Sequence, residues 1–350
     1  MRRVVVWALG LLVACGGAEE RGGRTEPPEE MSVSTASASA RTQASAAAPA
    51  ASVATADERA EDEPPEESSA PPPKLAITNP APETTAFMRL RGCRMGFVGL
   101  RLAREAYLGS LGSKRPGPGA IPGFGVALPA NSARATTLPY ARLLRNCNVA
   151  AALKDAVMDP HRQVVRDAGA AGLDLANTLT LANSYYFKQD YLQDAFQAGS
   201  DMHDKLVQGF KGIDPATPPL DAALRALESA RAKAAQKGSE TRRLSAAATD
   251  AAFKLALSLE PKPDMKAFRA TTTELGKAAL ALEAWQSAHS GESDPFVKLG
   301  LSPLKSLESK AAAFQSSTPT VEERVELLSL CSRFIETDYR AEGRSLRDKH

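Results

Sequence analysis

The sequence predicts an all-α protein: an elongated antiparallel helical bundle behind a disordered N-terminal tether. Three observations support this fold class. Over most of the chain beyond residue 84, apolar residues recur at alternating steps of three and four, which places them on one face of a helix. No comparable run alternates at the period of two that a strand requires. Residues 16–84 show neither period, and their Ala, Ser, Thr, Pro and Glu content gives too little apolar surface to fold.

The chain begins with a short apolar run. Residues 4–14 follow Arg2 and Arg3, and the run ends in Leu-Val-Ala-Cys at 12–15 with two glycines after it. Eleven residues are too few for a membrane span, which needs about 20, and suit a removable secretory signal. The pattern resembles the signal and lipobox of bacterial lipoproteins.

That resemblance implies that residues 1–14 are removed as a signal peptide and that acyl chains on Cys15, palmitate among them, anchor the mature chain in a membrane. Gly16, rather than Asp, follows the cysteine, as in Gram-negative lipoproteins that are sent to the outer membrane. We therefore expect a cell-envelope protein, anchored in the outer membrane and facing the periplasm. The alternative is a soluble secreted protein cut near Ala14.

Residues 15–84 form the tether. Pro-Pro-Glu-Glu occurs in it at 27–30 and again at 64–67. Positions 16–84 hold 13 acidic and 5 basic residues, a net charge of −8, whereas the chain from residue 85 onward carries +8. A flexible chain of this length spans roughly 45 Å, so the folded part can stand well away from the membrane.

Residues 85–135 form a basic, Gly/Pro-rich segment with one amphipathic helix expected in it. Its bases could lie on an anionic envelope surface, because each base near such a surface contributes about 1 kcal/mol. The alternative, which we favour, is a solvated helix whose apolar side joins the bundle. Nucleic acid is not expected as a partner in this compartment. The arginines concerned are Arg89, Arg91, Arg94, Arg101 and Arg104.

Residues 136–350 are expected to form the bundle domain. Asp-Pro pairs at 159–160 and 294–295 and a capping box at Thr320 and Glu323 indicate helix starts, and Pro261 and Pro263 separate two helices. Short connections favour antiparallel neighbours. We expect helices near 139–156, 160–189, 191–211, 219–258 with a break at Gly238, 264–289, 296–314 and 320–340.

A distinctive segment lies at 185–206. It has paired tyrosines at a helix end, an Asp-Tyr turn, an aspartate before an aromatic residue and a His-x-x-Leu step, carried by Tyr185, Tyr186, Tyr191, Asp194 and His203. The segment resembles the YiiG-like family of bacterial lipoproteins, an all-helical family of unknown function. The match covers roughly 60 residues well, and 85–135 departs from it. The resemblance implies a fold and a compartment but no catalytic residues.

Two interpretations of this segment remain open. In the first, His203 packs in a helix–helix seam with a hydrogen-bond partner, on one apolar stripe with Leu192, Phe196, Leu206 and Phe210. In the second, a small polar site near Tyr186, Asp194 and His203 serves an envelope enzyme that acts on cell wall or lipid. We favour packing, because His203 has no second ligand at metal spacing.

Motif searches indicate no catalytic residues, metal site or cofactor. The four histidines are scattered, and neither a Gly-x-Ser-x-Gly elbow nor a phosphate-binding loop occurs. In an oxidising compartment, two of Cys93, Cys147 and Cys331 could form a disulfide, or Cys147 and Cys331 could be buried free thiols. We therefore expect a membrane-anchored envelope lipoprotein with a non-catalytic binding, spacer or scaffold role, and the enzyme as the alternative.

Overall fold

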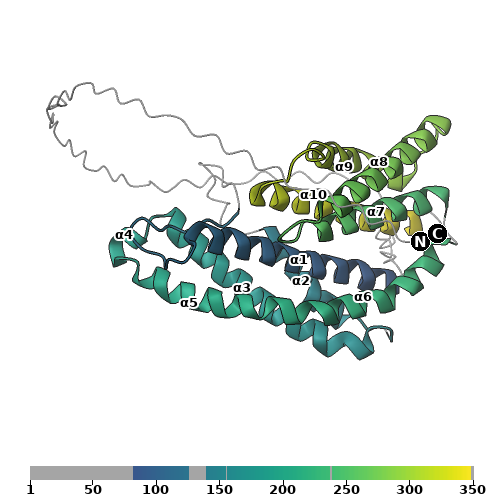
Figure 1. Cartoon of the computed structure of the whole chain (residues 1–350). Coiled ribbons are helices and arrows are strands. Elements are labelled where there is room, and N and C mark those ends of the chain that lie inside the picture. Colours follow the sequence, from purple (N-terminus) through teal and green to yellow (C-terminus); the bar gives the residue numbers. More distant parts are fainter. Residues whose placement is uncertain (1–81, 126–138, 155, 237–238, 348–350) are drawn as a thin grey trace, which may run out of the picture. The chain divides into compact units, whose positions relative to one another are not determined.

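The computed structural model describes residues 82–125, 139–154, 156–236 and 239–347 (Figure 1). These residues fold into helices and connecting turns, with no strand among them, and a single isolated bridge pairs Gly117 with Ala120. The all-α fold class is thus confirmed for the described part of the chain. The expected signal peptide, Cys15 and nearly all of the expected tether lie outside the described residues.

Most of the helices follow one another with short connections, whereas residues 112–138 separate the first helix from the second. The first group comprises α1 (Pro82–Leu111), α2 (Pro139–Ala152), the 3₁₀ turn η1 (Asp159–His161), α3 (Arg162–Phe187), α4 (Tyr191–Asp194), α5 (Gln197–Lys211) and α6 (Ile213–Gln236). The second group comprises α7 (Glu240–Ser258), α8 (Met265–Ala288), α9 (Pro295–Ala312) and α10 (Val321–Arg347).

Helix α1 lies at the centre of the packing. It contacts α2, α3, α5 and α6 on one side and α7 and α10 on the other (Figure 1). Helices α7, α8, α9 and α10 pack around one another in turn, so α1 is shared by two groups of helices. The segment 85–135, predicted to precede the bundle, therefore supplies its central helix.

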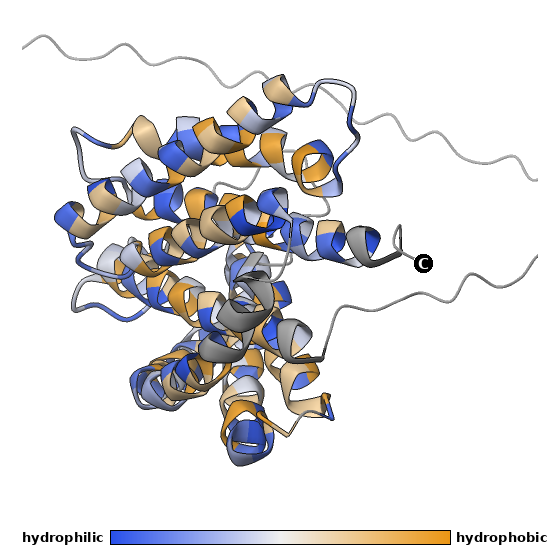
Figure 2. Ribbon diagram, turned by 90° about the vertical axis from the view of Figure 1, so that its right-hand side faces the viewer, coloured by the Kyte–Doolittle hydropathy of each residue, from blue (hydrophilic) through white to orange (hydrophobic). Residues whose placement is uncertain are grey.

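The reason for this position is the distribution of apolar residues on α1. Phe87, Leu90, Val98, Leu100 and their neighbours point in every direction around the helix, and each of these is at most 2% exposed. Residues 86–103 of this helix are therefore packed on nearly all sides, whereas its last turns, which include Leu108, reach solvent. The apolar side of this helix joins the bundle as expected, but Arg91 and Arg94 are buried rather than solvated. The other helices are amphipathic, and hydrophobic and hydrophilic residues alternate along them in Figure 2.

Helix α2 runs antiparallel to α1 at close range, because glycines on α1 face it. A Cβ at Gly96 would lie 2.8 Å from the Leu144 side chain, and one at Gly99 would lie 2.4 Å from the Tyr140 side chain. Cys93 and Cys147 join the two helices by a disulfide, whereas Cys331 is a buried free thiol. Of the pairings left open by the sequence, Cys93–Cys147 is the one present.

Several helix boundaries differ from expectation. The expected helix 219–258 starts earlier, at Ile213, and α6 and α7 are separate helices on either side of the expected break at Gly238. The expected helix 191–211 is two helices, because Ala195 and Phe196 have positive φ angles of 50° and 68°. The break moves Leu192 away from the apolar stripe, and its exposed fraction is 70%.

Candidate functional site

The break between α4 and α5 is stabilised by Asp194. Its carboxylate accepts hydrogen bonds from the backbone N–H groups of Phe196 and Ala198, both at 3.0 Å, and from the Tyr185 hydroxyl at 2.6 Å. The Tyr185 hydrogen bond, followed by the backbone donors, lowers the pKa of Asp194. Burial, and then the hydrogen bond to Asp194, raises the pKa of Tyr185 to about 12. Asp194 therefore acts as a cap at the start of α5.

His203 lies on α5, where that helix packs against α1. Its Nδ1 is 3.1 Å from the hydroxyl of Tyr107 on α1, and the two rings are 5.9 Å apart. Burial, and then the nearby Arg115, lowers the pKa of His203, and burial raises the pKa of Tyr107. Both groups are therefore neutral at neutral pH. Tyr107 was missed from the sequence, because nothing in 85–135 marks it as a partner of a histidine 96 residues away.

The remaining predicted residues form an aromatic cluster between α3, α4 and α5. Tyr191 stacks on Phe196 with ring centroids 4.7 Å apart, and Tyr186 lies 6.0 Å from Tyr191. Gly199 lets the Tyr186 hydroxyl approach, since a Cβ there would lie 2.3 Å from it. The structure thus brings Tyr185, Tyr186, Tyr191 and Asp194 together, whereas His203 makes a separate contact with Tyr107 on α1.

Four of the five arginines of α1 face carboxylates of the protein itself. Arg94 contacts Asp221 and Glu260, both at 2.8 Å, and only 5% of Arg94 is exposed. Arg101 contacts Glu260 at 2.6 Å and Asp214 at 3.1 Å. The remaining contacts are Arg104 to Asp214 at 2.9 Å, Arg91 to Asp250 at 2.5 Å and Arg89 to the side chain of Asn146 at 2.9 Å.

These contacts show that most of the basic residues of α1 are paired within the protein. A charged group that is buried must be paired, and here carboxylates on α6, on α7 and in the turn after α7 supply the pairs. The Arg104 guanidinium also lowers the pKa of Asp214. Arg91, Arg94, Arg101 and Arg104 therefore bind α6 and α7 to α1 through internal ion pairs, whereas Arg89 donates to Asn146 on α2.

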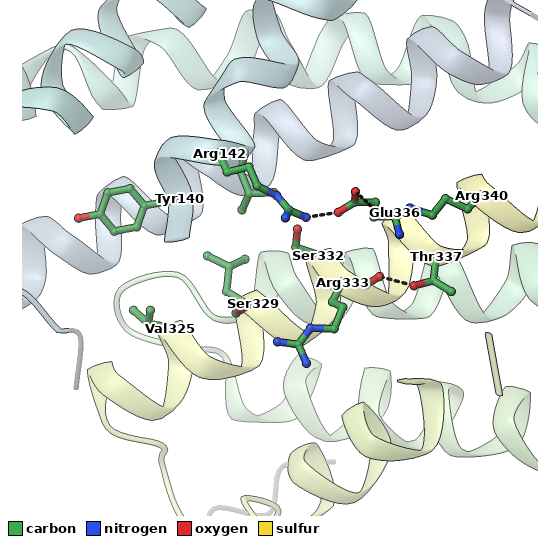
Figure 3. Close-up of a pocket in the computed structure, with 11 residues that line it drawn as sticks. Tyr140, Arg142, Val325, Ser329, Ser332, Arg333, Glu336, Thr337 and Arg340 are labelled. Carbon is green, nitrogen blue, oxygen red and sulfur yellow. Dashed lines mark hydrogen bonds and ion pairs between the residues drawn. The ribbon is translucent and has the colours of Figure 1, made fainter. Parts of the chain in front are cut away.

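Two adjoining hollows lie along the line where α2 meets α10, and we call them together the α2–α10 groove. We call the hollow of about 370 Å³ between α2 and α10 the outer hollow, and we call the hollow of about 350 Å³ that also reaches α1, the central helix, the inner hollow. Arg142 on α2 and Glu336 on α10 line both hollows and form an ion pair between them (Figure 3).

The groove is strongly basic. Arg89, Arg142, Arg145, Arg333 and Arg340 line it, against one acidic residue, Glu336. Glu336 also contacts Arg340 at 2.8 Å, one turn along α10, and Figure 3 shows both arginines directed at it. The hydroxyl-bearing residues Ser329, Ser332 and Thr337 complete the outer hollow.

This groove was missed from the sequence. Arg142 and Glu336 are 194 residues apart, so only the fold brings them together. A partial signal was present: Arg333, Glu336 and Arg340 recur at steps of three and four, and Arg142 and Arg145 at a step of three, which places each set on one helix face.

Among the described residues, no group of three or more His, Cys, Asp or Glu side chains could hold a metal ion. Within the same ranges, no helix has both the length and the apolar character needed to cross a bilayer. Comparison of the chain with protein-family models, curated proteins and solved structures found no match.

Proposed function

We propose that the protein is a lipid-anchored lipoprotein of the bacterial envelope whose helical domain binds a ligand or partner without catalysis. The single observation that carries the anchor is the coincidence of a short secretory signal with the Leu-Val-Ala-Cys sequence that ends at Cys15. The outer membrane, with the domain facing the periplasm, is the location that Gly16 favours. The resemblance of 185–206 to the YiiG-like lipoproteins supports the same compartment.

The disulfide supports this proposal independently of the signal. Disulfides persist in oxidising compartments, including the periplasm, and are rare in the reducing cytosol. Cys93 and Cys147 pair although a third thiol, that of Cys331, stays free within the same fold. The disulfide and the secretory signal are both expected of a domain that is exported from the cytosol.

A binding role is supported by the groove, and the enzyme alternative gains no such support. The groove presents arginines to solvent around two hollows of a size typical of small-molecule sites. By contrast, Asp194 is occupied by backbone N–H groups and by Tyr185, and His203 contacts Tyr107. Among the described residues, the hydrogen-bond partners of Asp194 and His203 are backbone N–H groups and buried tyrosine hydroxyls, which supports packing at Tyr186, Asp194 and His203 over an acid/base pair.

The anchor is tested by Cys15→Ser in cells fed an alkyne analogue of palmitate. We expect the variant to lose acyl labelling and to keep residues 1–14, because lipoprotein signal cleavage follows acylation of the cysteine. Cys331→Ala is the matched control and should label and mature as the parent does, since Cys331 is a buried thiol. Labelling of Cys15→Ser at the parent's level would remove the basis for the proposal.

A further inference from the structure

We propose that the α2–α10 groove binds a long-chain carboxylate, with the acyl chain in the inner hollow and the carboxylate among the arginines. This inference deepens the binding role proposed above and rests on it. It assigns a ligand class to a surface built by three helices, α1, α2 and α10.

The inner hollow suits an apolar chain. Its walls are formed by side chains from α1, α2 and α10, and its volume of about 350 Å³ lies in the range of small-molecule sites. Val149 is 41% exposed on α2 and provides apolar surface that solvent reaches. The apolar lining residues are Met88, Met95, Leu143, Val149, Ile335 and the ring of Tyr339.

The charges at this hollow suit an anion, because three arginines line it against one carboxylate, that of Glu336. Arg89 donates to Asn146 and lies over the Tyr339 ring at 5.2 Å, and Arg142 is paired with Glu336. Arg145 lines the same hollow and has no ion-pair or hydrogen-bond partner among the described residues. One carboxylate would pair with this guanidinium, and arginine binds carboxylates in a bidentate geometry.

The Arg142–Glu336 pair supports a carboxylate in particular. The side chains are 65% and 35% exposed, so the pair is partly solvated and contributes little to stability. Arg142 already accepts a carboxylate as its partner in the groove. A ligand carboxylate can therefore take the place of the Glu336 carboxylate at Arg142, since both are carboxylates. Glu336 then keeps its contact with Arg340 at 2.8 Å.

The walls of the groove favour an acyl chain over a peptide. Helices use their backbone N–H and C=O groups internally, so α2 and α10 offer no sheet edge to an extended peptide, whose own backbone would need partners. An acyl chain has no such groups. Each additional methylene that enters the hollow should strengthen binding about fourfold, the equivalent of about 0.8 kcal/mol.

The test uses the protein as purified from cells that express the full chain and are fed the alkyne analogue of palmitate, reconstituted in phospholipid nanodiscs, and a dodecanoate that carries a photoreactive diazirine. We expect saturable labelling of residues that line the inner hollow, mapped by mass spectrometry. Dodecanoate should compete with the probe, dodecanol should compete at least tenfold more weakly, and octanoate should compete far more weakly than dodecanoate.

Variants separate the charge from the fold. Arg145→Gln should weaken labelling about tenfold. Val149→Asp puts a carboxylate with the same negative charge as the ligand at an exposed position of the hollow, and it should weaken labelling at least as much. Arg166→Gln is the matched control, an exposed arginine on α3 away from the groove, and should label as the parent does. Each variant should keep the helical circular dichroism of the parent.

Three results would overturn the inference. These are no saturable labelling in the groove, equal competition by dodecanol, and tenfold stronger competition by dodecyl phosphate, which would assign a phosphate ligand instead. Acyl labelling at Cys15 is read in the same samples. Its presence without groove labelling would overturn the ligand class alone, whereas its absence would overturn the anchored lipoprotein itself.

Discussion

Tyr107 and His203 form a polar contact inside an otherwise apolar seam. Tyr107 is fully buried, and its ring also contacts Phe124 and Phe210 at 5.6 and 6.0 Å. A buried hydroxyl without a partner is costly, and Nδ1 of His203 is the partner that the described structure gives it. The role of His203 is therefore to satisfy Tyr107, which agrees with the packing interpretation.

A double-mutant cycle tests this contact. His203→Leu should destabilise the protein by about 1–2 kcal/mol, because it leaves the Tyr107 hydroxyl unpaired, and Tyr107→Phe should cost about 1 kcal/mol. The double variant should be more stable than the sum of the two losses predicts, since no hydroxyl is then left unpaired. Urea unfolding measures all four proteins. Strictly additive losses would mean that the two side chains do not depend on each other.

The pH dependence of stability tests the same residue. Burial lowers the pKa of His203 in the folded state, so the unfolded chain binds a proton at His203 near pH 6.5 while the folded protein does not. The stability associated with neutral His203 is therefore complete above pH 6.5 and falls as the pH drops below it. Between pH 7.5 and 5.5, the parent should lose more stability than His203→Gln. An identical pH profile for the two proteins would contradict the lowered pKa.

At the scale of elements, the corner between α4 and α5 depends on side-chain hydrogen bonds rather than on helix propensity. Ala195 and Phe196 adopt left-handed conformations that residues with a Cβ rarely adopt. Asp194 offsets the cost of these conformations by accepting hydrogen bonds from the N–H groups of Phe196 and Ala198, and the Tyr185 hydroxyl orients its carboxylate. The corner turns Phe196 and α5 toward α3.

Two variants test the corner. Tyr185→Phe should lower stability by about 1 kcal/mol, because it removes the hydroxyl that binds Asp194 and keeps the ring. Asp194→Ala should lower it further, since it also removes the acceptor of two backbone N–H groups. Asp201→Ala, an exposed aspartate on α5, is the control and should have little effect. If the effects of Asp194→Ala and Asp201→Ala are the same, the carboxylate does not hold the corner.

For the described molecule as a whole, α1 is the element on which the other helices depend. Its apolar side chains fill the space between two groups of helices, and its arginines pair with carboxylates on α6, on α7 and beyond α7. The disulfide Cys93–Cys147 then fixes α2, and with it one wall of the groove, to this central helix. A change in the α1–α2 contact should therefore affect both stability and groove binding.

Removal of the disulfide tests this dependence. The linked cysteines are 54 residues apart, and closing a loop of that length stabilises a protein by about 4 kcal/mol in the chain-entropy model. The double variant Cys93→Ser and Cys147→Ser should lose a stability of this order and should no longer respond to a thiol reductant. Thermal melting with and without reductant measures both effects. Cys331→Ala should keep the reductant sensitivity, and a parent protein that ignores reductant would refute the prediction.

The sequence by itself determined most of the helices and the order in which they occur. Apolar spacing and caps are local properties, so Asp264 and Asp294 bind the first N–H groups of α8 and α9, and the break expected at Gly238 separates α6 from α7. The predicted packing residues also came together, because Tyr185, Tyr186, Tyr191 and Asp194 are close in the chain and need only one corner to meet.

Only the tertiary structure decided which charges are buried and where a groove forms. The arginines of α1 are a solvated face or an internal layer depending on carboxylates more than 100 residues away, such as Asp221 for Arg94. The groove needs Arg142 and Glu336, 194 residues apart, to lie on facing helices. Burial and ion pairing depend on which helices become neighbours, and helical periodicity specifies a buried face for each helix without specifying its partner.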